Sequence, residues 1–299
     1  MQSVQIETEQ QVVVKKHARL LKFLHDCKHF IITQKIGFVS ILIILVMIAI
    51  AIFAPVIAPY DPISQNREAI LTGPNAEHIM GTDDLGRDVF SRIVYGARIS
   101  ILVGFGSILL AIVIGTILGL VSGYFGGIID MVIQRIMDAI LAIPALILAL
   151  FIASLLGPAV QNVIIAIVII SIPQFARIVR GEMLRVREMN FVEASRAIGA
   201  NPFRILLKHG LPNMLAPIIV VASLGFGAAI IAEASLSFLG IGTPPPNPSW
   251  GLMLSNASRY METAPWLVIF PGLALALLVL ALNLLGDALR DFWDPKLSL

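Results

Sequence analysis

The sequence predicts an all-α integral membrane protein with six transmembrane helices. Of its 299 residues, 58% are hydrophobic and 13% are charged, whereas soluble domains carry charge on about a quarter of their residues. The apolar residues gather in windows near the roughly 20 residues that a helix needs to cross a hydrocarbon core of about 30 Å. These windows show no two-residue alternation, and lipid cannot satisfy backbone polar groups, so we expect helices and not barrel strands. The windows are 37–59, 99–122, 138–156, 160–178, 214–240 and 266–286.

Lysine and arginine residues fix the expected orientation. They are concentrated in the tail before the first window and in the segment between the fourth and fifth windows. An even number of crossings places that segment and both termini on one side, which the positive-inside rule makes the cytoplasm. We therefore expect a multi-pass protein of the bacterial inner (plasma) membrane. The first window is too long for the apolar core of a signal peptide, so we expect it to be retained.

The predicted organisation has four parts. One cytoplasmic loop, 179–213, lies within the third part. The parts are a cytoplasmic tail 1–36, a first transmembrane helix with an extracytoplasmic loop 37–96, a core of five transmembrane helices 97–288 with the cytoplasmic loop 179–213, and a cytoplasmic tail 289–299.

Small residues and prolines mark special positions in the windows. Gly115, Gly119 and Gly123 repeat every four residues, a pattern that lets another helix approach closely. Prolines within or near windows can kink the helices that contain them. These are Pro144, Pro173 and Pro271.

Charged residues near the windows are few. Glu233 lies deep in the fifth window, and an intramembrane carboxylate is a functional candidate by default. The alternative, which we favour, is that Glu233 faces the bundle interior or a cavity and is satisfied by a serine, a backbone group or a neighbouring subunit. Asp130, Arg135 and Asp138 border the third window, and we expect them to pair locally.

Catalytic and metal-binding motifs are absent from the sequence. It contains no phosphate-binding G-x-x-x-x-G-K-[ST] loop, no H-E-x-x-H, no cysteine pair and no G-x-S-x-G elbow. His78 and His209 are assigned to opposite sides of the membrane. We therefore expect no catalytic residue, no metal site, no cofactor and no enzymatic activity in this chain, so an ATP-driven role would require a separate subunit. A net charge of +2 gives no basis for binding nucleic acid.

The segment between the fourth and fifth windows predicts two short helices. The first ends at Gly199, which can take a left-handed conformation. Asn201 suits the start of the second, over 203–208, which Gly210 and Pro212 are expected to end. We expect a cytoplasmic helix parallel to the membrane, with nothing to bury against in its own chain and hence a docking role.

That segment, EASRAIGANPFRILLKHGLPN, resembles a known signature. Its E-A-S, G and L-P positions are similar to the E-A-A, G and L-P positions in membrane subunits of ATP-binding-cassette (ABC) importers, although His209 replaces an Ile. Two further blocks, HIMGTDDLGRDVFSRIVYGARIS and AEASLSFLGIG with PPPNPSWG, resemble the second-type permease subunits of the dipeptide, oligopeptide and nickel group.

The resemblance implies a type I ABC importer permease-like bundle with a cytoplasmic coupling helix, residues 193–199, which inserts into a cleft of the ATPase. Glu193 would contact the ATPase, Ala194 would permit close approach and Gly199 would set the turn. The residues so assigned to ATPase coupling are Glu193, Ala194, Ser195, Arg196, Gly199, Leu211 and Pro212.

The implied partners are a homologous permease, two ABC ATPase subunits that bind ATP and magnesium, and an extracytoplasmic solute-binding protein. The implied solute is a di- or oligopeptide, with nickel or another small solute as the alternative. A secondary transporter driven by ions at Glu233, an intramembrane enzyme and a structural scaffold are separate alternatives, and we disfavour all three.

The outer loops also carry expectations. Local Asp–Arg pairing within GTDDLGRD is favoured over contact with solute, and Thr82, Asp83 or Asp84 is expected to cap a helix beginning near Arg87. Trp250 suits a membrane–water boundary. By the resemblance, both outer loops form the landing surface for the binding protein.

Overall fold

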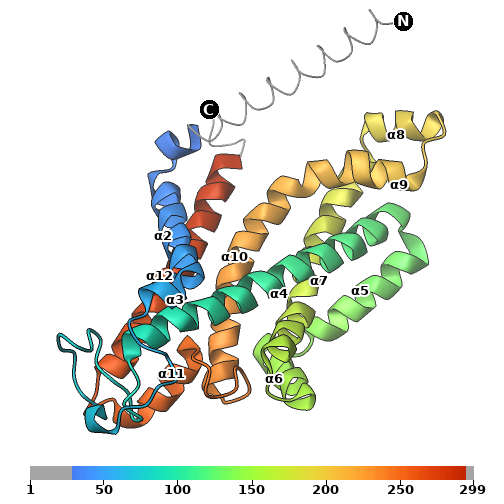
Figure 1. Ribbon diagram of the computed structural model, residues 1–299. Coiled ribbons are helices and arrows are strands. Elements are labelled where there is room, and N and C mark those ends of the chain that lie inside the picture. Colours follow the sequence, from blue (N-terminus) through green and yellow to red (C-terminus); the bar gives the residue numbers. More distant parts are fainter. Residues whose placement is uncertain (1–28, 294–299) are drawn as a thin grey trace, which may run out of the picture.

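The computed structural model describes residues 29–293, which form helices joined by loops, with one isolated β-bridge between Thr82 and Asp88 (Figure 1). Within these residues, five helices are long and apolar enough to cross a membrane, and the count is six if the bent pair α5–α6 is taken as one span. Cys27 and most of the predicted N-terminal tail lie outside the described residues. The α-helices are α2 Lys35–Ile52, α3 Ala54–Ile57, α4 Val89–Phe125, α5 Gly127–Leu141, α6 Ala145–Leu156, α7 Val160–Arg187, α8 Asn190–Ala197, α9 Pro202–Ile205, α10 Leu211–Phe238, α11 Trp250–Ala257 and α12 Trp266–Trp293.

The two ends of the bundle carry different parts of the chain. Figure 1 places the start of α2, the end of α12 and the pair α8–α9 at one end. The connection between α3 and α4 lies with α11 at the opposite end. This arrangement is the one expected from an even number of crossings.

The contact between α4 and α7 is the most extensive helix pairing in the described chain, and the glycine stripe makes it possible. A Cβ atom on Gly119 would lie 2.6 Å from the Ala176 carbonyl oxygen and 2.7 Å from the Val179 Cβ. Gly115 and Gly123 leave equally little room, at 2.6 Å and 2.7 Å from the nearest α7 atoms. The backbones therefore meet without intervening side chains, which confirms the close approach predicted from the sequence.

The third predicted window is wrong as a single helix. The structure divides it into α5 and α6, which meet at an angle of 90°. Pro144 stands at the N-cap of α6 with φ −52° and ψ 127°, and a proline disfavours helical geometry in the residue before it. Hydropathy averaged over the window does not register this break.

The predicted end of the second cytoplasmic helix is also wrong. Gly199 does take a left-handed conformation, with φ +76°, and the Asn201 side chain accepts a hydrogen bond from the Phe203 amide at 3.0 Å. Beyond α9, however, a π-helical turn, Leu206–Gly210, leads directly into α10. Pro212 has no amide hydrogen to give to the helix, and the wider turn ahead of it accommodates that loss.

Two expectations for the outer end need correction. Helix α4 is capped by Asp88, whose Oδ2 accepts the Ser91 amide at 2.7 Å, and not by Thr82, Asp83 or Asp84. The Trp250 side chain is not exposed, so it does not contact lipid or water as a residue at a membrane–water boundary would. It is fully buried and donates its indole N–H to the Ile93 carbonyl at 3.0 Å, because Gly96 leaves room for its ring.

The glycine contact predicts unequal effects of two matched substitutions on α4. Gly119→Ala forces a methyl group against the α7 backbone and should lower the free energy of unfolding by about 1–3 kcal/mol. Gly106→Ala should be neutral or stabilising, because a Cβ there has its nearest neighbour at 3.9 Å. Thermal unfolding of the detergent-solubilised protein measures both, and equal melting temperatures would contradict the close packing.

Candidate functional site

Helix α8 is anchored through one face and open on the other. Val192 is fully buried and belongs to an apolar cluster with Met183, Val186 and Ile205. The expectation that this helix has nothing to bury against is therefore wrong. The side chains of Glu193, Ala194, Arg196 and Ala197 are nevertheless exposed.

Side-chain contacts fix the orientation of α8. The Ser195 hydroxyl donates to the Phe191 carbonyl at 2.7 Å and lies 3.5 Å from His209 Nε2. The rings of Phe191 and His209 are 5.6 Å apart. His209, which replaces the Ile of the general signature, thus holds α8 against the π-helical turn.

A cation–π contact joins α8 to the end of α4. The Arg196 guanidinium lies 5.0 Å from the centroid of the Tyr124 ring, within the range for attraction between a cation and an aromatic face. Helix α8 is therefore attached to α4 through Arg196 as well as to α7 through Val192.

The turn after α8 presents exposed apolar side chains. Ile198 is 86% exposed and Phe203 is 69% exposed, on either side of Gly199. Within residues 29–293, the Glu193 carboxylate has no hydrogen-bond or ion-pair partner. A partner protein that covered this turn would bury both apolar side chains and meet an unpaired charge.

The structure divides the predicted coupling residues into two groups. Residues 193–199 form one exposed projection at the end of the bundle. Leu211 and Pro212 begin α10, at the base of that projection. Ile198 lay within the predicted coupling helix but was not among the residues assigned to the ATPase contact, and Phe203 was given no coupling role, although two large apolar residues in a charged segment between windows could have indicated one.

The charges of α5 pair with α7 and not locally, which corrects the sequence expectation. Arg180 Nε and Nη2 donate to the two Asp130 oxygens at 2.5 and 2.6 Å. Arg177 Nη2 donates to Asp138 at 2.6 Å. Arg135 has no ion-pair or hydrogen-bond partner in the described part of the chain. These pairs fasten α5 to the helix that carries α8.

Glu233, a residue of α10, is fully buried where α10 packs against α4. Its Oε2 accepts the Ser100 hydroxyl at 3.0 Å and its Oε1 accepts the Ser237 hydroxyl at 2.7 Å. Serines therefore satisfy this carboxylate, as in the alternative that we favoured. The arrangement forms a polar tie between two membrane helices.

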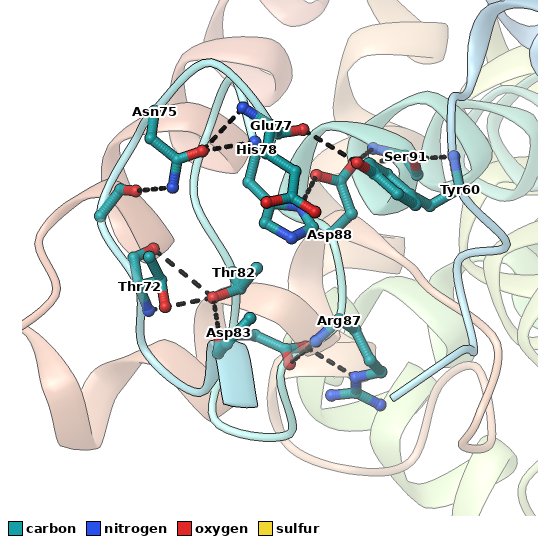
Figure 2. A network of polar contacts seen from close by, with 12 residues as sticks. Tyr60, Thr72, Asn75, Glu77, His78, Thr82, Asp83, Arg87, Asp88 and Ser91 are labelled. Atoms are coloured by element: carbon teal, nitrogen blue, oxygen red, sulfur yellow. Dashed lines mark hydrogen bonds and ion pairs between the residues drawn. The ribbon is translucent and has the colours of Figure 1, made fainter. Parts of the chain in front are cut away.

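Paired polar residues also organise the loop before α4, as Figure 2 shows. Asp88 Oδ1 lies 3.0 Å from His78 Nδ1, and Asp88 Oδ2 accepts the Ser91 hydroxyl at 2.7 Å. Asp83 Oδ2 accepts Arg87 Nε at 2.7 Å. The local Asp–Arg pairing predicted for GTDDLGRD is confirmed, and these side chains hold the loop together. Among residues 29–293 there is no group of three or more His, Cys, Asp or Glu residues that could hold a metal ion.

Two family models match this chain. The model of the family described as binding-protein-dependent transport system inner membrane component matches residues 115–299. The model described as N-terminal TM domain of oligopeptide transport permease C matches residues 31–74.

Curated relatives extend over most of the chain. The dipeptide transport system permease protein DppC of Alkalihalophilus pseudofirmus is 49% identical, over 89% of this chain and 87% of its own length. DppC of Haemophilus influenzae is 46% identical, over 87% of this chain and 90% of its own. The glutathione transport system permease protein GsiD of Escherichia coli is 45% identical, over 89% and 88%.

A solved structure shows the same fold. A chain of the MetNI methionine ABC transporter aligns with a TM-score of 0.55 and 22% identity, over 69% of this chain and 98% of that chain. The chain is thus a multi-pass inner membrane protein with a transport role. It belongs to the family of binding-protein-dependent transport system inner membrane components, the permease subunits of ABC importers.

Proposed function

We propose that this chain is one permease of an ATP-driven importer of di- or oligopeptides and forms half of the translocation pathway with a second, homologous permease. The relatives named for dipeptide and glutathione transport support the class of solute. The observation that carries the mechanism is the α8 projection, which is anchored on one face and open on the other. Nickel or another small solute remains the alternative cargo.

The exposed face of α8 is the surface that we assign to the ATPase subunit. Ala194 and Ala197 permit a close approach of the partner backbone, and Glu193 offers an unpaired carboxylate to its cationic or polar groups. Ile198 and Phe203 supply apolar area, and burying such side chains contributes about 1.5–3 kcal/mol each. ATP and magnesium are bound by two such ATPase subunits and not by this chain.

The internal contacts of α8 give a route for transmitting motion. A force on α8 reaches α7 through the buried Val192 and reaches α4 through the Arg196–Tyr124 contact. The Asp130–Arg180 pair couples α5 to the same unit. Closure of the ATPase pair would thereby rearrange the spans, closing the inner gate and opening the outer one in alternating access.

The proposed orientation puts α8 and both termini in the cytoplasm. The arginines and lysines near α8 support it through the positive-inside rule. The loops at the opposite end then face the solute-binding protein. The paired residues of Figure 2 would keep the first of these loops in a defined shape for that contact.

Replacement of Ile198 tests the docking surface. Ile198→Ser should reduce both the recovery of ATPase subunits with the solubilised permease and ATP-dependent peptide uptake into membrane vesicles, because apolar contact area is lost. Val56→Ser is the matched control, since Val56 is 83% exposed but lies on α3, near the other end of the bundle. Uptake and recovery that stay normal in Ile198→Ser would contradict the assignment.

Replacement of Glu233 separates the proposal from an ion-coupled transporter. Glu233→Ala leaves the hydroxyls of Ser100 and Ser237 without their acceptor and should lower the free energy of unfolding by about 1–3 kcal/mol. Glu233→Gln keeps an acceptor oxygen and should keep most peptide uptake, driven by ATP and insensitive to ionophores. Loss of uptake in a stably folded Glu233→Gln protein, with ionophore sensitivity in the unmodified one, would favour ion coupling.

A further inference from the structure

The C-terminal end of α4 receives an arginine from α7. The last carbonyl groups of a helix lack donors within the helix and carry partial negative charge. In α4, the Ser122 carbonyl accepts the Gly126 amide at 3.1 Å, and the Gly123 carbonyl accepts Arg187 Nη1 at 3.2 Å. The last four residues of α4, 122–125, include no lysine, arginine or histidine. A side chain from α7 therefore supplies a donor and a positive charge that α4 lacks at this end.

Glycine residues let the guanidinium lie close to the α4 backbone. Gly126 follows the last residue of α4 with φ +67°, a positive value that favours glycine. A Cβ atom added to Gly126 would lie 3.4 Å from Arg187 Nη1, and one added to Gly123 would lie 2.7 Å from the Met183 Cβ. Met183 lies one turn of α7 before Arg187. Arg187 thus extends the contact between α4 and α7 beyond the glycine stripe, toward the connection that leads to α8.

The Arg187 side chain is committed to this contact. Within residues 29–293 it forms no ion pair, and its hydrogen bond goes to the α4 backbone. The Asp130 carboxylate, near the start of α5, is held by Arg180 and by the Ser122 hydroxyl. Arg187 therefore attaches the end of α4 directly to α7, without a carboxylate between them.

The contact lies beside α8. Arg187 is the last residue of α7, and two residues separate it from Asn190, where α8 begins. Arg196 of α8 lies over the ring of Tyr124, the residue after Gly123. Two consecutive residues of α4 thus receive one arginine from α7 and one from α8. Arg196 is exposed on α8, whereas Arg187 is half-buried against α4.

Arg185 provides a comparison on the same helix. It carries the same charge two residues before Arg187, but its side chain is 58% exposed. In the described part of the chain its hydrogen bonds stay within α7, where it donates to Glu182 at 2.8 and 3.0 Å. A role that needs contact between helices therefore belongs to Arg187 and not to Arg185.

We propose that Arg187 is a positioning residue that carries the movement of α8 to α4. This inference rests on the proposed function. When closure of the ATPase pair displaces α8, the Arg187 guanidinium holds the last turn of α4 to the connection between α7 and α8, so that the two helices move together. Without this contact, α8 moves while α4 lags behind, and ATP is hydrolysed without the matching rearrangement of the spans.

The distance between two spin labels tests the movement. In a Cys27→Ser background, Phe125→Cys and Asn190→Cys place the labels at exposed positions, at the end of α4 and the start of α8. In the whole complex, this distance should be the same without nucleotide and with a non-hydrolysable ATP analogue. In Arg187→Gln it should differ between the two states. A distance that changes equally with and without the arginine would overturn the proposal.

The number of labelled trialanine molecules imported per ATP hydrolysed tests the functional role. Loss of a hydrogen bond from a charged donor corresponds to roughly 10- to 100-fold in an equilibrium, so Arg187→Gln should lower this ratio at least about tenfold in proteoliposomes containing the whole complex. Arg187→Lys keeps a charged donor and should retain a substantial part of the ratio. Arg185→Gln is the matched control and should behave like the unmodified protein.

The ratio separates a positioning role from a purely structural one, because loss of folded complex lowers uptake and hydrolysis together. If the unmodified complex imports no trialanine, the proposed function fails; if it does and Arg187→Gln keeps the ratio, only the role of Arg187 fails. Recovery of ATPase subunits with Arg187→Gln should be normal. Loss of that recovery, or an equal fall of the ratio in Arg185→Gln, would contradict the positioning role.

Discussion

The direct backbone contact between α4 and α7 is the constraint on which the rest of the structure depends. Three glycines on α4 remove the side chains that would otherwise separate the helices. α7 then continues to Arg187, beyond its apolar part, and carries α8 at its end. The position of the proposed docking surface relative to the membrane helices therefore follows from the packing of α4 on α7, because close packing of small residues takes the place of the hydrophobic effect between helices in a bilayer.

Charge is used sparingly in the described part of the chain, and several ion pairs and hydrogen bonds of charged residues join one helix to another. Arg180 and Arg177 hold α5 to α7, and Glu233 joins α4 to α10 through serine hydroxyls. Glu193, in contrast, is left without a partner on an exposed face. The paired charges fix the helices relative to one another, and Glu193 is available to a partner.

Much of the fold could be predicted from the sequence because hydropathy and the glycine spacing are local signals. The windows found the membrane helices, and the repeat of Gly115, Gly119 and Gly123 identified a close contact. Pro144 was identified as a residue that can kink a helix, but averaging over the apolar window concealed that the helix ends there and the chain turns by 90°. The continuation past Pro212 was missed because a π-helical turn removes the usual conflict between proline and a helix.

The site could be predicted only in part. Gly199 was identified as the end of a helix from its conformational freedom, and the coupling residues of the 193–199 segment were identified from the resemblance to the permease signature. The partners of Asp130 and Asp138 could not be, because they lie about two helices further along the chain and only the fold brings them together. The burial of Trp250 was not predicted for the same reason, since its ring packs against Gly96 on another helix.

The central claim is that α8 is the contact with the ATPase, and photo-crosslinking from its exposed face tests it most directly. A photoreactive amino acid would replace Ala194 in the assembled complex, with the same group at Val56 as a reference. We expect an adduct between the permease and an ATPase subunit from position 194 and none from position 56. Absence of an adduct from 194, or an equal adduct from 56, would contradict it.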